Sequence, residues 1–203
     1  YENPAARLTV LGVTGTNGKT TTTYLLKAIL EQARGAKVGL IGTNQNMIGS
    51  DVIPTERTTP ESFEVQKLFR EMADAGCTHV VMETSSHALY LDRVYGVRYD
   101  VGIFTNLTQD HLDFHKTMEN YCDAKAILFR NCVAGVVNAD DPWTPRLLKD
   151  ADCKVMTYAE QADADLRAEN IVLSAGGIAF DAVSGAERIP IRVNIPGGFM
   201  VYN

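Results

Sequence analysis

The sequence predicts an α/β fold: a mostly parallel sheet with a phosphate-binding loop and helices on both faces, plus a small β-rich carboxyl-terminal extension. Three observations support this prediction. Apolar runs of strand length alternate with amphipathic segments of helical period. A glycine-rich turn joins the first apolar run to the first helix. Short alternating segments replace the helical period late in the chain, so we expect a core over about 1–160 and the extension over about 161–203.

The composition is that of an acidic globular protein. The 203 residues carry a formal net charge of −6 and are 45% hydrophobic, which is enough to bury a core. The acidic balance and the lack of basic runs argue against a nucleic-acid partner. No apolar stretch is long enough to cross a membrane, and the first residues do not resemble a signal peptide. The four cysteines have neither metal-site nor disulfide-framework spacing, so we expect reduced thiols and a cytoplasmic location.

The first strand, turn and helix together resemble a phosphate site. The strand is expected at Leu8–Val13 and the helix at Thr22–Arg34, with TGTNGKTT between them. Glycines let the backbone approach an anion, the first helical amides point at it, Lys19 adds charge and the Thr20 hydroxyl can hold Mg²⁺. Val13 stands where the usual G-x-x-x-x-G-K-[ST] pattern has glycine. The alternative is a strand–turn–helix joint whose glycines occur by chance.

The next segments predict a strand, a loop and a helix. The strand is expected at Lys37–Ile41, and Gly42–Glu56 reads as a polar loop or a short hairpin. A helix should follow with Thr59 as N-cap and Pro60 at its first position, and Gly76 should stop it. Its apolar face holds Val65, Leu68, Phe69, Met72 and Ala73.

The remaining core alternates strands with helices. Strands are expected at 78–82, 100–104, 134–137 and 154–158. A helix is expected at about Thr117–Arg130, and a short one after Pro142. This order predicts a parallel sheet whose ligands lie at the carboxyl ends of its strands. That edge would carry the phosphate loop, Glu83–His87, Asn106–Asp113 and Asn138–Asp141. The extension should hold antiparallel strands at 166–174, 177–182 and 189–194.

Acidic groups at this edge suit a metal or proton-transfer role. Glu83 ends an apolar strand and suits a Mg²⁺ ligand or a water-positioning group; alternatively it caps the following turn. The segment Asp110–His115 packs two acids and two histidines into six positions. It suits a metal or proton-transfer site, or a turn in which the aspartates cap a helix and the histidines are exposed.

Lys125 lies in the apolar stripe of the helix that follows Thr117. That stripe consists of Tyr121, Ala124, Lys125, Leu128 and Phe129. Burying an ammonium group is costly, so this group should be paired or neutral. Two alternatives follow. In the first, the aliphatic part of the side chain packs against apolar residues while the ammonium group, the head of the side chain, reaches water. In the second, the side chain faces the site as a charge or in a modified form.

Several motifs in this order resemble the Mur ligases, the ATP-dependent amide-forming enzymes of bacterial cell-wall synthesis. The family's phosphate loop also lacks the first glycine, which accounts for Val13. Within the family, the chain looks like the ligases that extend UDP-N-acetylmuramoyl-L-alanyl-D-glutamate. The resemblance rests on GTNGKTT from Gly15, ETSSHAL from Glu83 with Arg93, NLTQDHLD from Asn106 and YCDAK from Tyr121.

The resemblance implies roles for individual residues. The ATP phosphates would contact Gly15, Thr16, Asn17, Gly18, Lys19, Thr20 and Thr21, with Asn138 near the nucleotide base. Mg²⁺ would be held by Thr20, Glu83, His111 and a carbamate formed on Lys125. The UDP-muramoyl dipeptide would contact Thr58, Thr59, Ser85 and Arg93, whereas Leu91 replaces a glutamine of some members. The catalytic groups would be Lys19, Lys125 and His111.

The resemblance also implies a two-step reaction. The substrate carboxylate takes the γ-phosphoryl group of ATP, and the amino group of lysine, diaminopimelate or another amino acid then displaces phosphate. The family's amino- and carboxyl-terminal domains are absent from this sequence, so we expect that it cannot complete ligation alone. The alternatives are another Mur ligase, a folylpolyglutamate synthase or a nucleotide-binding module without turnover. A phosphate-loop kinase or GTPase is disfavoured, because neither an N-K-x-D motif nor an arginine-rich lid is present.

Overall fold

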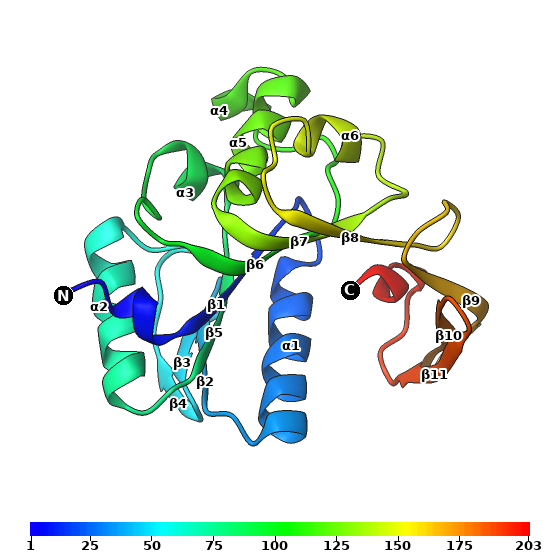
Figure 1. Cartoon of the computed structure of the whole chain (residues 1–203), viewed down its shortest axis with the longest axis horizontal. Coiled ribbons are helices and arrows are strands. Elements are labelled where there is room, and N and C mark those ends of the chain that lie inside the picture. Colours follow the sequence, from blue (N-terminus) through cyan, green and yellow to red (C-terminus); the bar gives the residue numbers. More distant parts are fainter.

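A single mixed sheet organises the molecule. A computed structural model describes residues 1–203 and confirms the α/β fold with helices on both faces (Figure 1). The sheet has 11 strands in the order β11-β10-β9-β8-β7-β6-β1-β5-β2-β3-β4. Neighbouring strands from β2 through β9 along this order pair in parallel, whereas β3, β4, β10 and β11 join the two edges in antiparallel fashion.

The elements have the following bounds. The strands are β1 (Thr9–Thr14), β2 (Val38–Ile41), β3 (Asn46–Ile48), β4 (Asp51–Ile53), β5 (His79–Glu83), β6 (Tyr99–Phe104), β7 (Cys132–Asn138), β8 (Lys154–Ala159), β9 (Leu166–Ser174), β10 (Gly177–Ser184) and β11 (Glu187–Val193). The helices are α1 (Lys19–Arg34), α2 (Ser62–Asp74), α3 (Ser86–Tyr90), α4 (Leu112–His115), α5 (Met118–Arg130) and α6 (Thr144–Leu147), with 3₁₀ turns η1 (Pro4–Arg7) and η2 (Gly198–Tyr202).

The two faces of the sheet bury unequal cores. Successive residues of a strand point to opposite faces, so Val10 joins one core and Leu11 the other. The core beneath α2 and α5 has 26 buried residues, whereas the core beneath α1 has 6. Most apolar burial therefore stabilises the α2 and α5 side, which is also the side from which Lys125 reaches the carboxyl edge.

One predicted helix start is wrong. The N-cap of α2 is Glu61, which forms a reciprocal capping box with Glu64, and neither Thr59 nor Pro60 begins the helix. The Thr59 hydroxyl instead donates to the Glu83 carbonyl at 2.7 Å, so a contact with β5 outcompetes the local cap. The start of α5 is as expected, because the Thr117 hydroxyl accepts from the Asn120 amide at 3.2 Å.

Short elements account for the other differences. The segment Gly42–Glu56 contains the β3–β4 hairpin, which decides between the two alternatives. The helices α3 and α4 have 5 and 4 residues, too few for an amphipathic period to reveal them. None of the helices is long and apolar enough to pass through a membrane. All four cysteines are free thiols, of which Cys77 and Cys122 are buried.

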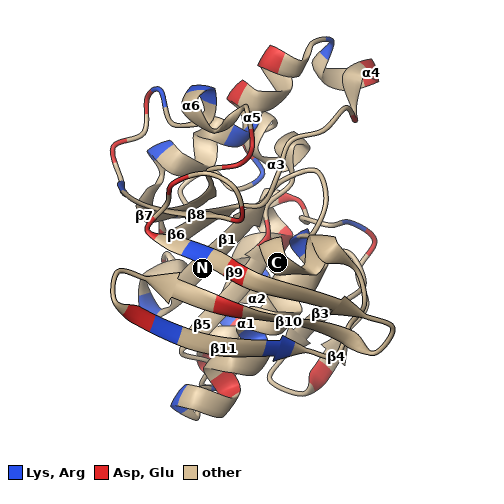
Figure 2. Cartoon of the chain, turned by 90° about the vertical axis from the view of Figure 1, so that its right-hand side faces the viewer, with Lys and Arg blue, Asp and Glu red and all other residues tan.

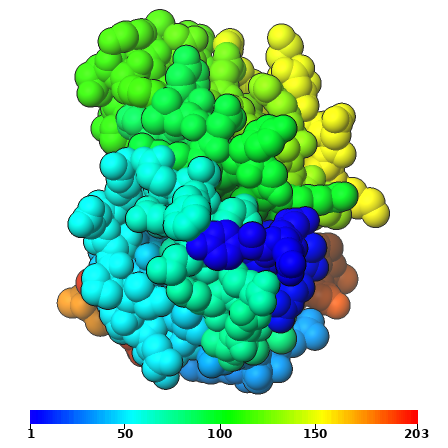
Figure 3. All heavy atoms as spheres, turned by 90° about the vertical axis from the view of Figure 1, so that its left-hand side faces the viewer, coloured from blue at the N-terminus to red at the C-terminus, as the bar shows by residue number.

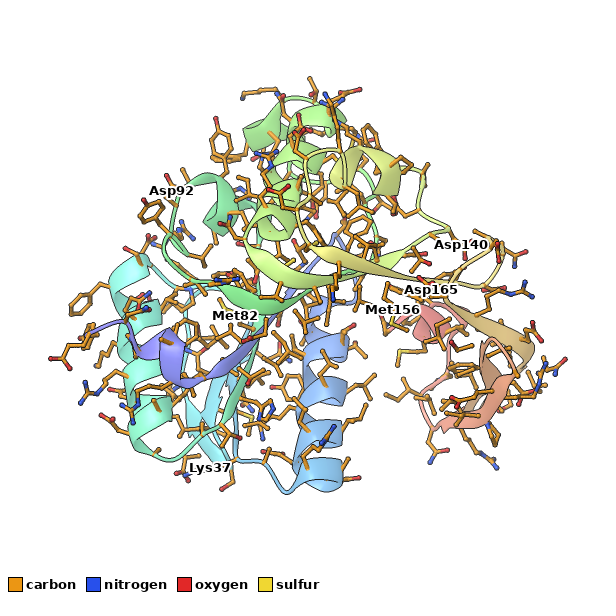
Figure 4. The ribbon with its side chains drawn as sticks, in the orientation of Figure 1. Lys37, Met82, Asp92, Asp140, Met156 and Asp165 are labelled. Atoms are coloured by element: carbon orange, nitrogen blue, oxygen red, sulfur yellow. The ribbon has the colours of Figure 1, made fainter.

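The extension continues the core sheet and is fastened to it by Asp140. Strand β9 pairs in parallel with β8, and β10 and β11 then follow as antiparallel strands. Asp140 accepts hydrogen bonds from the amides of Glu160 and Ala162, each at 2.6 Å, and from the Tyr202 hydroxyl at 3.0 Å. Figure 4 shows Asp140 and Asp165 where the core passes into the extension. At the other end of the chain, the amino-terminal segment lies across α2, where Arg7 pairs with Asp74 at 3.0 Å (Figure 3).

Candidate active site

The strand order brings the predicted site segments together. Strand β1 lies between β5 and β6, with Val13 paired to Glu83 and Thr14 paired to Phe104. The carboxyl ends of these three parallel strands therefore meet at one edge. The phosphate loop, the Glu83–His87 segment and the Asn106 segment are neighbours there, as the sequence predicts.

The phosphate loop has a backbone that only glycine permits. Gly15 has φ +148° and Gly18 has φ +88°, and a β-carbon at Gly15 would overlap the Thr105 hydroxyl. Asn106 holds the loop, since its carbonyl accepts from the Thr16 amide at 2.8 Å and its side chain from the Asn17 amide at 3.0 Å.

The first amides of α1 are available to an anion. A hydrogen bond from the Thr22 amide to the Gly18 carbonyl, at 2.9 Å, closes the first turn of the helix. The amide groups before Thr22 therefore have no partner within the helix, and the positive end of the helix dipole adds to their field.

Two lysines converge on one carbonyl oxygen of this loop. The Nζ atoms of Lys19 and Lys125 each lie 2.9 Å from the Gly15 oxygen, and Lys19 also donates to Thr16 at 2.9 Å. Lys125 is only 1% exposed, which excludes the alternative in which its head reaches water. Burial lowers the pKa of both lysines, and the charge of Lys19 lowers the pKa of Lys125 further. The charges of Glu83 and Asp110 oppose the lowering of the Lys19 pKa, and that of Asp110 opposes the lowering of the Lys125 pKa, but burial outweighs them, so the arrangement favours an added anion.

Glu83 lies within the site and does not cap the following turn. Its carboxylate accepts from the Thr20 hydroxyl at 3.0 Å and from the amide and hydroxyl of Thr43, each at 2.9 Å. A buried carboxylate beside a hydroxyl offers the hard oxygen ligands that Mg²⁺ prefers. Thr43 was not among the predicted site residues, although its position just beyond β2 at the carboxyl edge is a signal that could have identified it.

His111 takes no part in the hydrogen bonds that join Thr20, Thr43 and Glu83. It is exposed, has φ +51° and lies beside Asp110, with Nε2 3.4 Å from Oδ2. No group of three or more histidine, cysteine or acidic side chains is arranged to hold a metal ion. A Mg²⁺ ion at Thr20 and Glu83 would therefore take its other ligands from phosphate oxygens or water. The alternative in which both histidines of Asp110–His115 are exposed is wrong for His115, which is buried.

The four candidate substrate residues lie beside Glu83. The Thr59 hydroxyl accepts from the Ser85 amide at 3.0 Å, and Arg93 donates to the Thr59 carbonyl at 3.5 Å. The Thr58 hydroxyl lies 3.0 Å from the hydroxyl of Thr43. Side chains from three separate segments thus lie together beside the carboxyl end of β5.

Asn138 has a structural role in joining two strands. Its side-chain nitrogen donates to the Thr105 carbonyl at 2.9 Å, and its oxygen accepts from the Asp140 amide at 3.0 Å. Both ends of the amide therefore join β7 to β6 and to the following turn. Its predicted place near a nucleotide base stays a prediction.

Known proteins resemble the chain throughout. The family described as Mur ligase middle domain matches residues 13–203. A relative from Clostridium botulinum, named UDP-N-acetylmuramoyl-L-alanyl-D-glutamate–2,6-diaminopimelate ligase, is 52% identical over 100% of this chain and 42% of its own length. A relative from Clostridium acetobutylicum, whose name differs only by the numeral 1 at its end, is 53% identical over the same shares. The chain thus spans about 42% of the length of these curated relatives.

Solved structures agree with these matches. A structure named UDP-N-acetylmuramoyl-L-alanyl-D-glutamate–2,6-diaminopimelate ligase has a TM-score of 0.88 at 30% identity, covering 96% of this chain and 41% of that one. A UDP-N-acetylmuramoylalanyl-D-glutamyl-2,6-diaminopimelate–D-alanyl-D-alanyl ligase from Acinetobacter baumannii has a TM-score of 0.76 at 21% identity, covering 98% and 41%. The second likeness concerns the fold alone.

Proposed function

This chain belongs to the Mur ligase family, and we propose that it is the ATP-binding domain of a ligase that adds 2,6-diaminopimelate to UDP-N-acetylmuramoyl-L-alanyl-D-glutamate. The names and identities of the relatives support this substrate and amino acid. Because the chain spans about 42% of those relatives, the proposal includes flanking domains that complete the substrate sites.

The convergence of Lys19 and Lys125 on the Gly15 carbonyl carries the proposal. Each ammonium lies 2.9 Å from that oxygen, at the start of a helix whose first amides have no helical partner. The phosphates of ATP supply the negative charge that this arrangement lacks. Lys19 would then turn from the loop carbonyls to the phosphates and stabilise charge on the transferring group.

Thr20 and Glu83 are the residues that would hold Mg²⁺, through a hydroxyl and a carboxylate oxygen 3.0 Å apart. When bound, the ion neutralises phosphate charge. We place His111 as a candidate for a second ion, beside Tyr121, whose ring lies 6.0 Å from the imidazole between centroids.

Lys125 suits modification to a carbamate. Its lowered pKa, caused first by burial, increases the neutral amine fraction that attacks carbon dioxide. The neutral nitrogen bonds to the carbon of carbon dioxide, one carbon–oxygen π bond opens to leave the negative charge on oxygen, and the nitrogen loses one proton, so the neutral amine becomes an anion. Such an anion could orient a Mg²⁺ ion beside the loop, which the ammonium cannot do.

The substrate side supplies the acyl group. We assign Thr58, Thr59, Ser85 and Arg93 to the UDP-muramoyl dipeptide. Its carboxylate oxygen attacks the γ-phosphorus and ADP leaves. The amine of diaminopimelate then attacks the acyl carbon, inorganic phosphate leaves and the amine loses a proton.

Calorimetry of MgATP binding to this chain tests the proposal. We expect Lys19→Ala to weaken binding at least about 100-fold, because it removes a charge-assisted contact with the phosphates. Lys37→Ala is a matched control, since Lys37 also donates to a carbonyl, that of Ala75 at 2.9 Å, but at the opposite end of the sheet. Equal affinities in all three proteins would overturn the assignment of the phosphate loop.

Turnover separates a ligase from a nucleotide-binding module. The full-length protein should form ADP and product with diaminopimelate and the UDP-muramoyl dipeptide, and much less with lysine. Binding of MgATP without ADP formation in the presence of both substrates would favour the module.

A further inference from the structure

His115 occupies a buried position between the two halves of the proposed site. It is the last residue of α4 and is 4% exposed. Its Nε2 atom lies 2.9 Å from the Ser86 hydroxyl in the first turn of α3. Its ring stacks on Tyr121 of α5, with centroids 5.0 Å apart and planes inclined by 25°. None of the roles assigned above uses this side chain.

The two neighbours of His115 lead to opposite sides of the site. Ser86 follows Ser85, a candidate substrate residue whose hydroxyl caps α3. On the other side, the Tyr121 hydroxyl lies 3.3 Å from the Thr16 hydroxyl of the phosphate loop. The Lys125 Nζ lies 4.5 Å from the centre of the Tyr121 ring. His115 thus connects the substrate turn to the loop and to Lys125 through two contacts.

The hydrogen bond matters beyond simple packing. No other side-chain partner is found for the Ser86 hydroxyl, and Ser86 is 2% exposed. A buried hydroxyl without a partner is unfavourable, so its loss would allow α3 to shift until another partner is found. An apolar ring at position 115 could fill the space and stack on Tyr121, yet it would not hold Ser86.

We propose that His115 is a positioning residue of the ligase reaction, which fixes the Ser85–Ser86 turn relative to Tyr121 and the phosphate loop. This inference rests on the proposed function, since it concerns the relative placement of the acyl and phosphoryl groups. Small displacements between reacting groups affect turnover more than they affect ground-state binding. His115 should therefore influence kcat while leaving the affinity for ATP nearly unchanged.

Two variants separate the hydrogen bond from the packing. His115→Phe keeps a ring against Tyr121 but cannot bond Ser86. His115→Gln places an amide where Nε2 lies, so it can bond Ser86 but cannot stack in the same way. Ser86→Ala removes the same hydrogen bond from its other end.

The test measures kcat, the KM for ATP and the KM for the UDP-muramoyl dipeptide in the full-length ligase, with the thermal midpoint of each variant. We expect His115→Phe to lower kcat about 10- to 100-fold, with the KM for ATP within about threefold of wild type. His115→Gln should recover most of this loss. Ser86→Ala should reproduce it, and the double variant with His115→Phe should lose no more than either single variant.

The matched control is His79→Phe. The Nδ1 atom of His79 lies 2.8 Å from the Thr78 hydroxyl, so the same kind of bond is removed at the amino-terminal end of β5. This variant should keep wild-type kcat.

The outcomes distinguish this inference from the proposed function. An active wild type with an unimpaired His115→Phe variant overturns the inference alone. Equal losses of kcat in the Phe and Gln variants also overturn it, because packing would then be the decisive contribution. A wild type that forms no product overturns the proposed function, and the inference with it.

Discussion

The carboxyl edge of the core and the β9–β11 extension treat charged residues in opposite ways. At the edge, Glu83 and Lys125 are each 1% exposed, and their partners are hydroxyls, amides and a carbonyl. In the extension, Arg188 pairs with Glu169 at 2.7 Å and with Asp181 at 2.9 Å, and the side chain of Arg188 is 46% exposed. Figure 2 shows charged residues along β9, β10 and β11. The buried charges at the edge are therefore not paired one to one with opposite charges, whereas the charged side chains of the extension form ion pairs at the surface.

This difference separates function from stability. A buried charge that is incompletely compensated makes folding less favourable. The same charge can interact with a ligand, which is expected of a site that binds phosphate. A surface ion pair contributes little to folding, because water already solvates both partners. The edge should therefore respond strongly to small changes, and the extension weakly.

Two glycine substitutions give the largest expected contrast. We expect Gly15→Ala to lower the free energy of unfolding by about 3 kcal/mol, because strain at φ +148° adds to the overlap with Thr105. Gly185→Ala should lower it by only about 1 kcal/mol, since Gly185 has φ +57° but no atom lies within 4 Å of the added carbon. Urea unfolding of both variants measures the difference. Equal losses would show that the loop is no more tightly packed than the hairpin.

Acidification should affect the edge before the extension. Burial, followed by the charges of His87, Lys125 and His111, lowers the pKa of His115 from 6.5 to about 4, against an opposing contribution from Asp113. Between these values the unfolded chain binds a proton that the folded chain does not, so stability rises with pH. We expect a loss on the order of 2 kcal/mol between pH 7 and pH 4.5. Urea unfolding across this range measures the slope, which His115→Gln should reduce.

The extension should keep its ion pairs over the same pH range. Hydrogen bonds from Asn170 and Arg188 hold the pKa of Asp181 below its ordinary value, and a hydrogen bond from Arg188 does the same for Glu169. A carboxyl group whose pKa is lowered by folding stabilises the fold at pH values above its pKa in the unfolded chain. This stabilisation is lost only as the pH falls through its pKa in the folded chain. A chemical-shift titration that shows Asp181 protonating above pH 5 would contradict this expectation.

The smallest effect is expected from the surface network itself. Arg188→Ala removes both ion pairs of Arg188, yet we expect the thermal midpoint to change by less than about 2 °C, because exposed pairs contribute little. The remaining difference from wild type should shrink in high salt, which screens exposed charges. Calorimetric scans in low and high salt provide the measurement. A loss of stability in Arg188→Ala as large as the loss expected for Gly15→Ala would remove the distinction between the edge and the extension.

Much of the candidate site follows from patterns within short stretches of sequence. The glycines and Lys19 of the phosphate loop, Glu83 at a strand end and Lys125 in an apolar stripe are each visible within one element and its flanking turn. The structure confirms that these residues share one edge. Thr59 shows the limit of such reasoning, because its sequence context favours a helix cap and a contact with β5 prevails instead.

The sequence by itself determined the alternation of strands and helices, the phosphate loop and the place of Lys125 in an apolar stripe, because periodicity and glycine geometry act between near neighbours in the chain. The burial of the Lys125 head was decided only by the tertiary structure. Only the tertiary structure decided that Lys19 and Lys125 share the Gly15 carbonyl, that Thr43 binds Glu83 and that His115 joins Ser86 to Tyr121. These contacts, apart from that of Lys19, depend on strand order and helix packing. Residues far apart in the chain become neighbours only when the whole sheet forms, so patterns within a short stretch of sequence do not predict these contacts.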